Sequence, residues 1–312
     1  MSAGLFSLIA LASLQGCTEY DYGELSVRDI WTVPSLAGSS DILVVIDDSA
    51  SMAEEQERLG ENFHAFTDVV AGAYADFQIG VVTTDVDVTD AGLLRGGVMT
   101  PDTPDLEATF LEAVSVGTHG SRYEQGYEAA ALAVDQRLNP DFIRTSARLH
   151  VVFLSDEDDQ SPDKVPTYLD ILRDASGSGG LTAHAIVGDE PEGCASGIGA
   201  AGAGTRYLTA AVQTNGYTDS ICSDDYTEIL ERVGLDVAGL QDTYLLNQVA
   251  EPGTIQVWVD DVAMHERAQD GWQYDPGDNA VVFSGLAIPR SGMEVVAEYE
   301  LLLGVATEAD DQ

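Results

Sequence analysis

The sequence predicts an α/β fold in which a doubly wound, mostly parallel sheet is followed by a small C-terminal antiparallel β module. Two strongly apolar runs, within residues 41–51 and 148–156, have the composition of central parallel strands that are covered on both faces. Helix-like segments alternate with further strand-like segments around them, an order typical of a parallel sheet with helices on both faces. After about Gly239 the pattern changes to the alternation of antiparallel strands.

The expected helices share apolar residues near helical spacing, and they cover residues 52–74, 121–138, 207–213 and 225–237. Additional strands are expected at residues 77–85 and 181–189, with a short Gly-rich edge strand at 91–98. In the C-terminal module, alternating residues predict strands at 254–259, 280–283 and 293–299. Trp272 and Tyr274 of this module are candidates for a carbohydrate or peptide platform, but core packing is the favoured interpretation in so small a module.

These patterns divide the chain into five parts. They are a signal peptide with a lipobox at residues 1–17, a surface tether at 18–38, the α/β domain at 39–239, the β module at 240–304 and a disordered acidic tail at 305–312. A chain of 312 residues is long enough to form one large and one small domain.

Polar residues follow both apolar strands at the point where each strand ends. Asp47, Ser49 and Ser51 come after the first strand at alternate positions, and Asp156 comes directly after the second. Ligands of open α/β sheets bind beyond the carboxyl ends of such strands. Carboxylate and hydroxyl oxygens suit Mg²⁺ or Mn²⁺, whereas the alternative role for such residues after a strand is to cap a helix. Because both strands end in carboxylates, we expect a shared cation site.

With these residues the chain resembles the von Willebrand factor A (VWA) family, and the Gly-Thr-x-Gly-Ser and Ser-Asp-Glu-Asp-Asp stretches are most similar to its bacterial lipoprotein branch. The metal-ion-dependent adhesion site (MIDAS) of that family combines a DxSxS loop, a Thr or Ser from a second loop and an Asp from a third. Asp47, Ser49 and Ser51 match the first loop, and Asp156 matches the third. The resemblance covers roughly residues 40–240 and implies a VWA or Rossmann-like fold.

The second loop leaves two residues open. Within residues 116–125, the spacing to the following helix favours Ser121, whereas Thr118 has the more usual residue type. The resemblance implies a bound Mg²⁺, with Mn²⁺ or Ca²⁺ as alternatives, and a protein ligand that offers an acidic side chain to the metal. Asp85, at the end of strand 77–85, is an outer candidate for the same rim, although a turn residue is the favoured interpretation.

The first cysteine follows an N-terminal apolar stretch, residues 5–16, which is too short to span a bilayer and suits an export signal. Leu14-Gln15-Gly16-Cys17 resembles a lipobox, so we expect acylation of Cys17. The residue after the cysteine is Thr18 rather than Asp, which, by resemblance to the sorting of enterobacterial lipoproteins, favours the outer membrane. The alternative is an ordinary cleaved signal and a secreted protein.

The other two cysteines, Cys194 and Cys222, are an even pair in a chain that we expect to be exported. They flank a Gly- and Ala-rich segment at residues 195–204, which a disulfide between them would tether. A zinc site is the alternative, but no His lies near either cysteine in the sequence.

Composition restricts the partners. The net charge of −41, from 54 acidic and 13 basic residues, excludes nucleic acids, because phosphate contacts require Lys and Arg. It equally excludes charge-driven binding to anionic membranes, so membrane contact is expected through the lipid anchor only.

We therefore expect a non-enzymatic binding protein of the cell envelope. One alternative is a metal-dependent hydrolase that uses Asp47, Asp156 and Asp158, but no His lies near these carboxylates in the sequence to act as a base. The other is a structural envelope protein in which the metal only stabilises the fold. His119 is the one histidine beside a proposed metal loop, where it would tune the rim.

Overall fold

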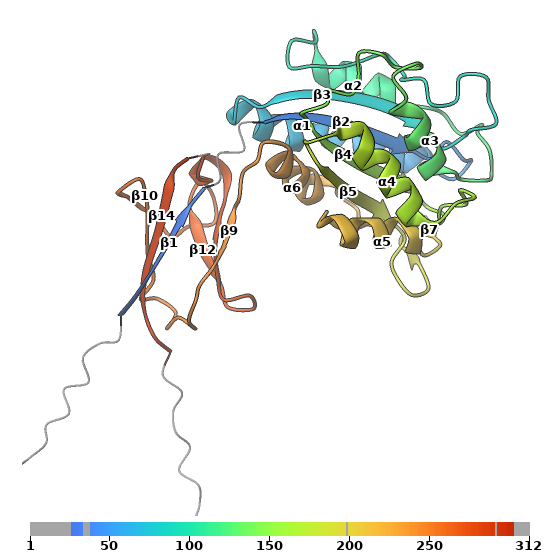
Figure 1. The fold of residues 1–312 in the computed structure, drawn as a ribbon. Helices are drawn as coiled ribbons and strands as arrows, with labels where there is room; N and C mark the ends of the chain where they lie inside the picture. Colours follow the sequence, from blue (N-terminus) through green and yellow to red (C-terminus); the bar gives the residue numbers. More distant parts are fainter. Residues whose placement is uncertain (1–25, 34–37, 198, 291, 303–312) are drawn as a thin grey trace, which may run out of the picture.

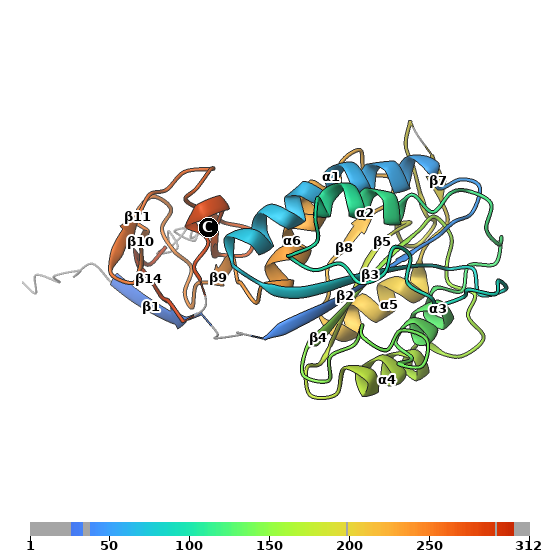
Figure 2. The same cartoon turned by 90° about the horizontal axis from the view of Figure 1, so that it is seen from above.

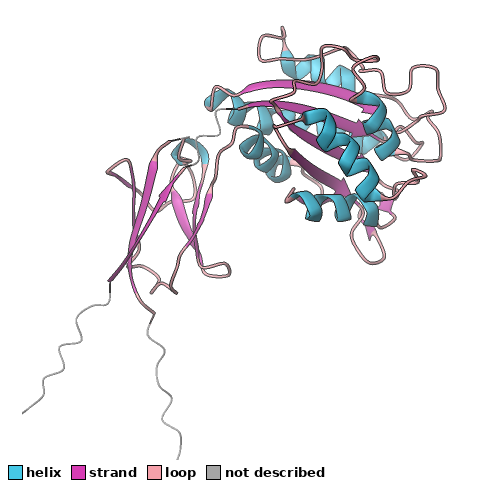
Figure 3. Ribbon diagram, viewed as in Figure 1, coloured by secondary structure: helices cyan, strands magenta, loops and turns pink. Residues whose placement is uncertain are grey.

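The structure is a computed structural model that describes residues 26–33, 38–197, 199–290 and 292–302. These residues form a mixed α/β fold with a five-stranded parallel sheet and additional antiparallel sheets (Figure 1, Figure 3). The expected signal peptide with Cys17 and the expected acidic tail lie outside the described residues. Among the described residues, no helix has the length and apolar character needed to span a membrane.

The parallel sheet consists of five strands, in the order β3 (Asp76–Thr83), β2 (Ser39–Ile46), β4 (Arg148–Ser155), β5 (Leu181–Val187) and β8 (Thr218–Ser220). Every neighbouring pair in this sheet is parallel. The apolar residues of β2 and β4 are buried on both faces, as their composition predicts. These two strands lie side by side, so the loops that follow them begin at the same edge.

Six helices accompany this sheet in the described residues: α1 (Ala53–Gly72), α2 (Leu106–Val114), α3 (Gly126–Ala133), α4 (Val165–Ser176), α5 (Thr205–Thr214) and α6 (Thr227–Val237). Helices α1, α2 and α6 form one core with Ile42, Val44 and Ile46 of β2. Helices α3, α4 and α5 form a second core with Leu43 and Val45. Since successive strand residues point to opposite faces, helices cover both faces of the sheet (Figure 2).

The β module contains two antiparallel sheets. The first has the order β1 (Ser26–Thr32), β14 (Glu294–Glu300), β10 (Gln256–Val259) and β11 (Val262–Met264), and the second has the order β12 (Trp272–Asp275), β13 (Ala280–Phe283) and β9 (Thr243–Leu245). A 3-10 helix, η1 (Gly285–Ala287), precedes β14. Residues of both sheets share one core, which includes Tyr244, Trp272 and Tyr299. Trp272 is therefore a core residue, as favoured, and its indole nitrogen donates to the Met264 carbonyl at 3.1 Å.

The expected tether at residues 18–38 is wrong for residues 26–32, because these form β1 and pair along their whole length with β14. The one buried residue of this strand is the polar Asp29. The strand therefore lacks the alternation of buried apolar residues by which strands are predicted from sequence. The Asp29 carboxylate accepts hydrogen bonds from the backbone and side chain of Asn247 at 2.8 and 2.7 Å and from the Tyr299 hydroxyl at 2.8 Å. The α/β domain is thus inserted, in sequence, between β1 and the remainder of the β module.

The edge strand expected at residues 91–98 is also wrong. This region forms turns in which Gly92, Gly96 and Gly97 adopt positive φ angles of 74°, 68° and 80°. Such angles are incompatible with an extended strand. The helix expected at residues 121–138 is shorter at both ends, because residues 121–125 belong to the loop before α3 and α3 ends at Ala133.

Candidate functional site

The first loop of the site follows β2 directly. Asp47 is fully buried, and its carboxylate accepts hydrogen bonds from the Ser49 backbone at 2.7 Å and from the Ser155 hydroxyl at 2.6 Å. The hydroxyl oxygens of Ser49 and Ser51 lie 3.4 Å apart. Helix α1 begins after Met52 without a side-chain hydrogen bond at its cap. Asp47, Ser49 and Ser51 therefore do not cap this helix.

The third loop meets the first. Asp156 follows β4, is 9% exposed, and lies close enough to Ser51 to receive a hydrogen bond from its hydroxyl. Burial, together with the neighbouring Asp47 and Glu157 carboxylates, raises the pKa of Asp156 to about 6. The two strands thus bring Asp47, Ser49, Ser51 and Asp156 into one cluster.

The second loop lies against the first through backbone contacts. The Gln56 side-chain amide donates to the carbonyls of Asp47 and Gly117 at 3.1 and 2.9 Å, and its oxygen accepts from the Gly117 backbone at 3.2 Å. The Gly120 backbone donates to the Asp48 carbonyl at 2.9 Å. A Cβ atom on Gly120 would lie 2.0 Å from the Asp48 carboxylate, so a larger residue there would require the Asp48 side chain to move.

The two candidate residues of this loop, Ser121 and Thr118, make contacts with other groups. The Ser121 backbone donates to Asp85 at 3.1 Å, and the Ser121 hydroxyl accepts from the Tyr123 backbone at 3.0 Å. Thr118 lines a surface hollow beside α1 and α2. Among the described residues, neither hydroxyl hydrogen-bonds to Asp47 or Asp156. Asp85 is buried and also accepts from the Asp87 backbone at 2.9 Å, so it supports both its own turn and the second loop.

Glu124, at the end of the second loop, is the residue that the sequence interpretation missed. It is fully buried, one carboxylate oxygen accepts a hydrogen bond from the Thr84 hydroxyl, and the other has no partner among the described residues. Burial, together with the adjacent Asp47 carboxylate, raises its pKa to about 9. In the sequence, an acidic residue just before an Ala-rich helix resembles an ordinary charge at a helix N-terminus, so no local signal marks it.

Four buried carboxylate oxygens at this edge of the sheet have no hydrogen-bond donor among the described residues: Asp48 Oδ1, Glu55 Oε2, Glu124 Oε1 and Asp156 Oδ1. Burial, together with the nearby Asp85 and Asp47, raises the pKa of Asp48 to about 6. The raised pKa values reflect in part the repulsion between neighbouring carboxylates, and a bound cation would relieve this repulsion. The donor set of carboxylates and hydroxyls fits Mg²⁺, Mn²⁺ or Ca²⁺.

A disulfide between Cys194 and Cys222 borders the cluster and confirms the expected pairing. The segment that it closes contains a short hairpin, β6 (Cys194–Ala195) and β7 (Ala200–Ala201). Just after this hairpin, the Gly202 backbone donates to the Asp156 carbonyl at 2.8 Å. A small pocket lies between the hairpin and the side chains of Ser51, Glu55 and Asp156.

The carboxylates that follow Asp156 serve a different purpose. Asp158 accepts from the Arg206 backbone at 2.8 Å, and the fully buried Asp159 side chain forms an ion pair with the Arg206 guanidinium at 2.9 Å. Asp159 also accepts hydrogen bonds from Ser161 and from the Tyr127 backbone. These residues connect the third loop to α3 and α5.

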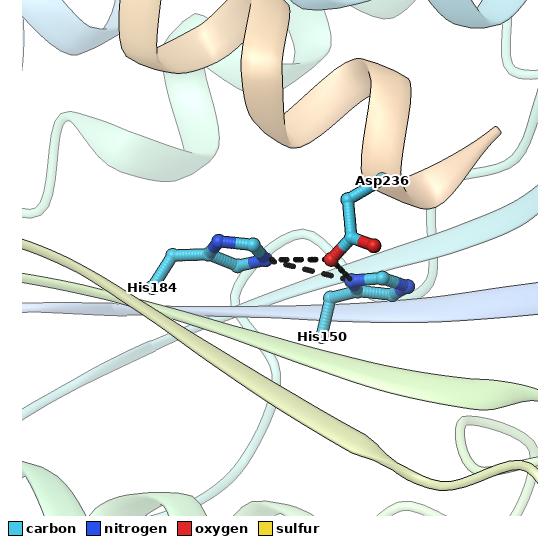
Figure 4. Close-up of side chains that lie close together, drawn as sticks. All are labelled: His150, His184 and Asp236. Atoms are coloured by element: carbon cyan, nitrogen blue, oxygen red, sulfur yellow. Dashed lines mark hydrogen bonds and ion pairs between the residues drawn. The ribbon is translucent and has the colours of Figure 1, made fainter. Parts of the chain in front are cut away.

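A second polar cluster lies between the sheet and α6, and contains His150, His184 and Asp236 (Figure 4). Asp236 Oδ2 lies 3.3 Å from His150 Nδ1 and 3.5 Å from His184 Nε2. The Tyr217 backbone N–H donates to His184 Nδ1 at 3.1 Å, so that nitrogen carries the lone pair and Nε2 carries the proton. A metal-bound imidazole would instead donate from its second nitrogen. The cluster is therefore an electrostatic contact that fastens α6 to β4 and β5.

Comparison with known proteins adds little to this geometry. No family model and no curated protein matches the chain. Among solved structures, the pilus adhesin SpaC from Lactobacillus rhamnosus GG aligns with a TM-score of 0.44 and 14% identity over 88% of this chain and 41% of the adhesin. Proximal thread matrix protein 1 from the mussel byssus aligns with a TM-score of 0.40 and 18% identity over 68% of this chain and 48% of its own. This chain thus spans less than half the length of either protein, and its function rests on the chemistry of its own site.

Proposed function

We propose that this chain is a VWA-like binding protein, similar to the bacterial lipoprotein branch of that family, which holds a divalent cation in a MIDAS-type site. The observation that carries the proposal is the meeting of Asp47, Ser49 and Ser51 with Asp156, although the two segments are about a hundred residues apart in the chain. The strand order supports a doubly wound sheet, because the chain proceeds from β2 to β3 on one side and to β4 on the other.

The proposed chemistry is binding through the metal rather than catalysis. The Ser49 and Ser51 hydroxyls are neutral ligands, so a bound Mg²⁺, Mn²⁺ or Ca²⁺ keeps positive charge that an acidic side chain of a partner protein can neutralise. The contact between Asp158 and Arg206 supports this choice over a hydrolase, which would need that carboxylate at the cation.

The proposed location is the cell envelope, with an acylated Cys17 as the outer-membrane anchor and secretion as the alternative. The Cys194–Cys222 disulfide supports export, because disulfides persist in oxidising compartments and are rare in the cytosol.

The test is calorimetric titration of the purified protein with Mg²⁺, Mn²⁺ and Ca²⁺. We expect wild type to bind and the double variant Asp47→Ala, Ser49→Ala to show no heat above dilution. The matched control is Asp174→Ala, Ser178→Ala, which removes the same residue types from exposed positions. Equal binding by both double variants would refute the site.

The partner is sought by pull-down from envelope extract in Mg²⁺ and in EDTA. We expect a protein that is retained in Mg²⁺ and released by EDTA, and that the Asp47→Ala, Ser49→Ala variant does not retain. A protein retained equally under both conditions would not be a ligand of this site.

A further inference from the structure

We propose that Glu124 supplies the ligand of the second loop to this cation, in place of Ser121 or Thr118. This inference rests on the proposed function and names a residue that the resemblance did not indicate. Its basis is the position of the Glu124 carboxylate, which is fully buried beside Asp47 and has one oxygen without a donor among the described residues.

Among the described residues, Glu124 has no cationic partner. Its carboxyl group accepts a hydrogen bond from the Thr84 hydroxyl and lies against the Asp47 carboxylate. Asp159 is an instructive contrast, because it is equally inaccessible but forms an ion pair with Arg206 and accepts hydrogen bonds from Ser161 and Tyr127. A buried polar oxygen without a hydrogen-bond partner is destabilising, and a cation shared with Asp47 would supply the partner that Glu124 Oε1 lacks.

The backbone holds Glu124 in this position from both sides. The Gln160 backbone donates to the Glu124 carbonyl at 2.6 Å, and the Gln125 backbone donates to the Thr84 carbonyl at 3.2 Å. Helix α3 begins directly afterwards at Gly126. These contacts join the second loop to β3 and to the third loop, so the carboxylate is presented to Asp47 by a rigid frame.

The two hydroxyls are poorer candidates by the same criterion. The Ser121 backbone N–H donates to Asp85, and the Ser121 hydroxyl accepts from the Tyr123 backbone. Thr118 lines the hollow beside α1 and α2. With Glu124 as ligand, three carboxylates, Asp47, Glu124 and Asp156, would surround one divalent cation. Such a site holds its metal more firmly than one with two carboxylates, and an acidic partner would bind by coordinating the metal ion directly rather than by neutralising a net positive site.

The experiment measures Mn²⁺ affinity of the full protein by electron paramagnetic resonance of the free ion. We expect Glu124→Gln to weaken binding at least about tenfold, the lower bound seen when even outer residues of metal sites are changed. Ser121→Ala and Thr118→Ala should each stay within about twofold of wild type, as should the exposed control Glu112→Gln. Circular dichroism verifies that each variant is folded.

The outcomes separate the two proposals. If wild type does not bind Mn²⁺, the proposed function fails, and the role of Glu124 fails with it. If wild type binds, Glu124→Gln binds equally and a hydroxyl variant loses affinity, the inference about Glu124 fails and the cation site remains. Should Glu124→Gln not fold, Glu124→Asp decides, because it keeps the charge but withdraws the carboxylate by one methylene. Retained affinity in Glu124→Asp would also overturn the inference.

Discussion

Buried titratable residues of this chain fall into two kinds, those with partners and those without. His184 belongs to the first kind, because the Tyr217 backbone donates to its Nδ1 and both His150 Nδ1 and Asp236 Oδ2 lie 3.5 Å from its Nε2. Burial, together with the neighbouring His150, lowers the pKa of His184 to about 3. Burial raises the pKa of Asp236, but contact with His150 and His184 lowers it further, so that the pKa of this carboxyl group lies below its usual value. The surroundings therefore favour the neutral form of His184 and the ionised form of Asp236.

The pH dependence of stability follows from His184. The folded protein keeps this imidazole neutral down to a pKa of about 3, whereas the unfolded chain protonates it near its usual value of 6.5. Stability is therefore complete above the unfolded pKa and is lost as the pH falls towards 3, by up to about 1.4 kcal/mol per pH unit. We expect the free energy of unfolding of His184→Asn, measured by circular dichroism between pH 4 and 6.5, to fall less steeply than that of wild type.

The exposed His64 provides the control for this experiment, because His64→Asn changes the same residue type without altering the core. Its slope should match that of wild type. Identical slopes in all three proteins would show that His184 titrates alike in the folded and unfolded states.

At the scale of elements, the β module depends on a strand that is separated from it in sequence. Strand β1 pairs with β14, and its buried Asp29 binds Asn247 and Tyr299. The three tryptophans, Trp31, Trp258 and Trp272, all belong to this module. Tryptophan fluorescence therefore reports the unfolding of the β module separately from that of the α/β domain.

We expect Asp29→Ala to destabilise the β module by about 2 kcal/mol, because it leaves the buried Tyr299 hydroxyl without its acceptor and removes two part-buried hydrogen bonds from Asn247. Urea unfolding followed by tryptophan fluorescence measures this change. Arg28→Ala is the matched control on the same strand, since its ion pair with Glu298 is about half exposed and contributes less than about 1 kcal/mol. A transition of Asp29→Ala that coincides with that of Arg28→Ala would mean that β1 is dispensable.

In the whole molecule, the insertion of the α/β domain determines where the edge with the proposed cation site lies. Helix α6 ends near the amino end of β2, where the Ser40 hydroxyl donates to the Val237 carbonyl at 2.9 Å, and the chain continues from there to β9. The loops of the proposed cation site follow the carboxyl ends of β2 and β4, and these ends lie on the side of the α/β domain away from the β module (Figure 1).

The anchor itself is tested by labelling with a fatty-acid analogue, followed by detergent partitioning of wild type and Cys17→Ser. We expect label and detergent-phase recovery for wild type only, because several acyl chains on one cysteine give stable membrane anchoring. Equal labelling of the two proteins, or recovery of wild type in the aqueous phase, would leave a secreted protein as the better description.

The sequence by itself determined the parallel sheet, the junctions where Asp47 and Asp156 leave it, and the pairing of Cys194 with Cys222. These features have strong local signals, since a strand buried on both faces is apolar throughout and a pair of cysteines in an exported chain has one partner each. Tertiary structure alone decided the place of Glu124, the pairing of β1 and the contact of His150 with His184. Each of these is a polar residue or an edge strand whose local pattern is ordinary, and only the packing of distant segments determines whether a charged group is exposed, paired or buried beside another charge.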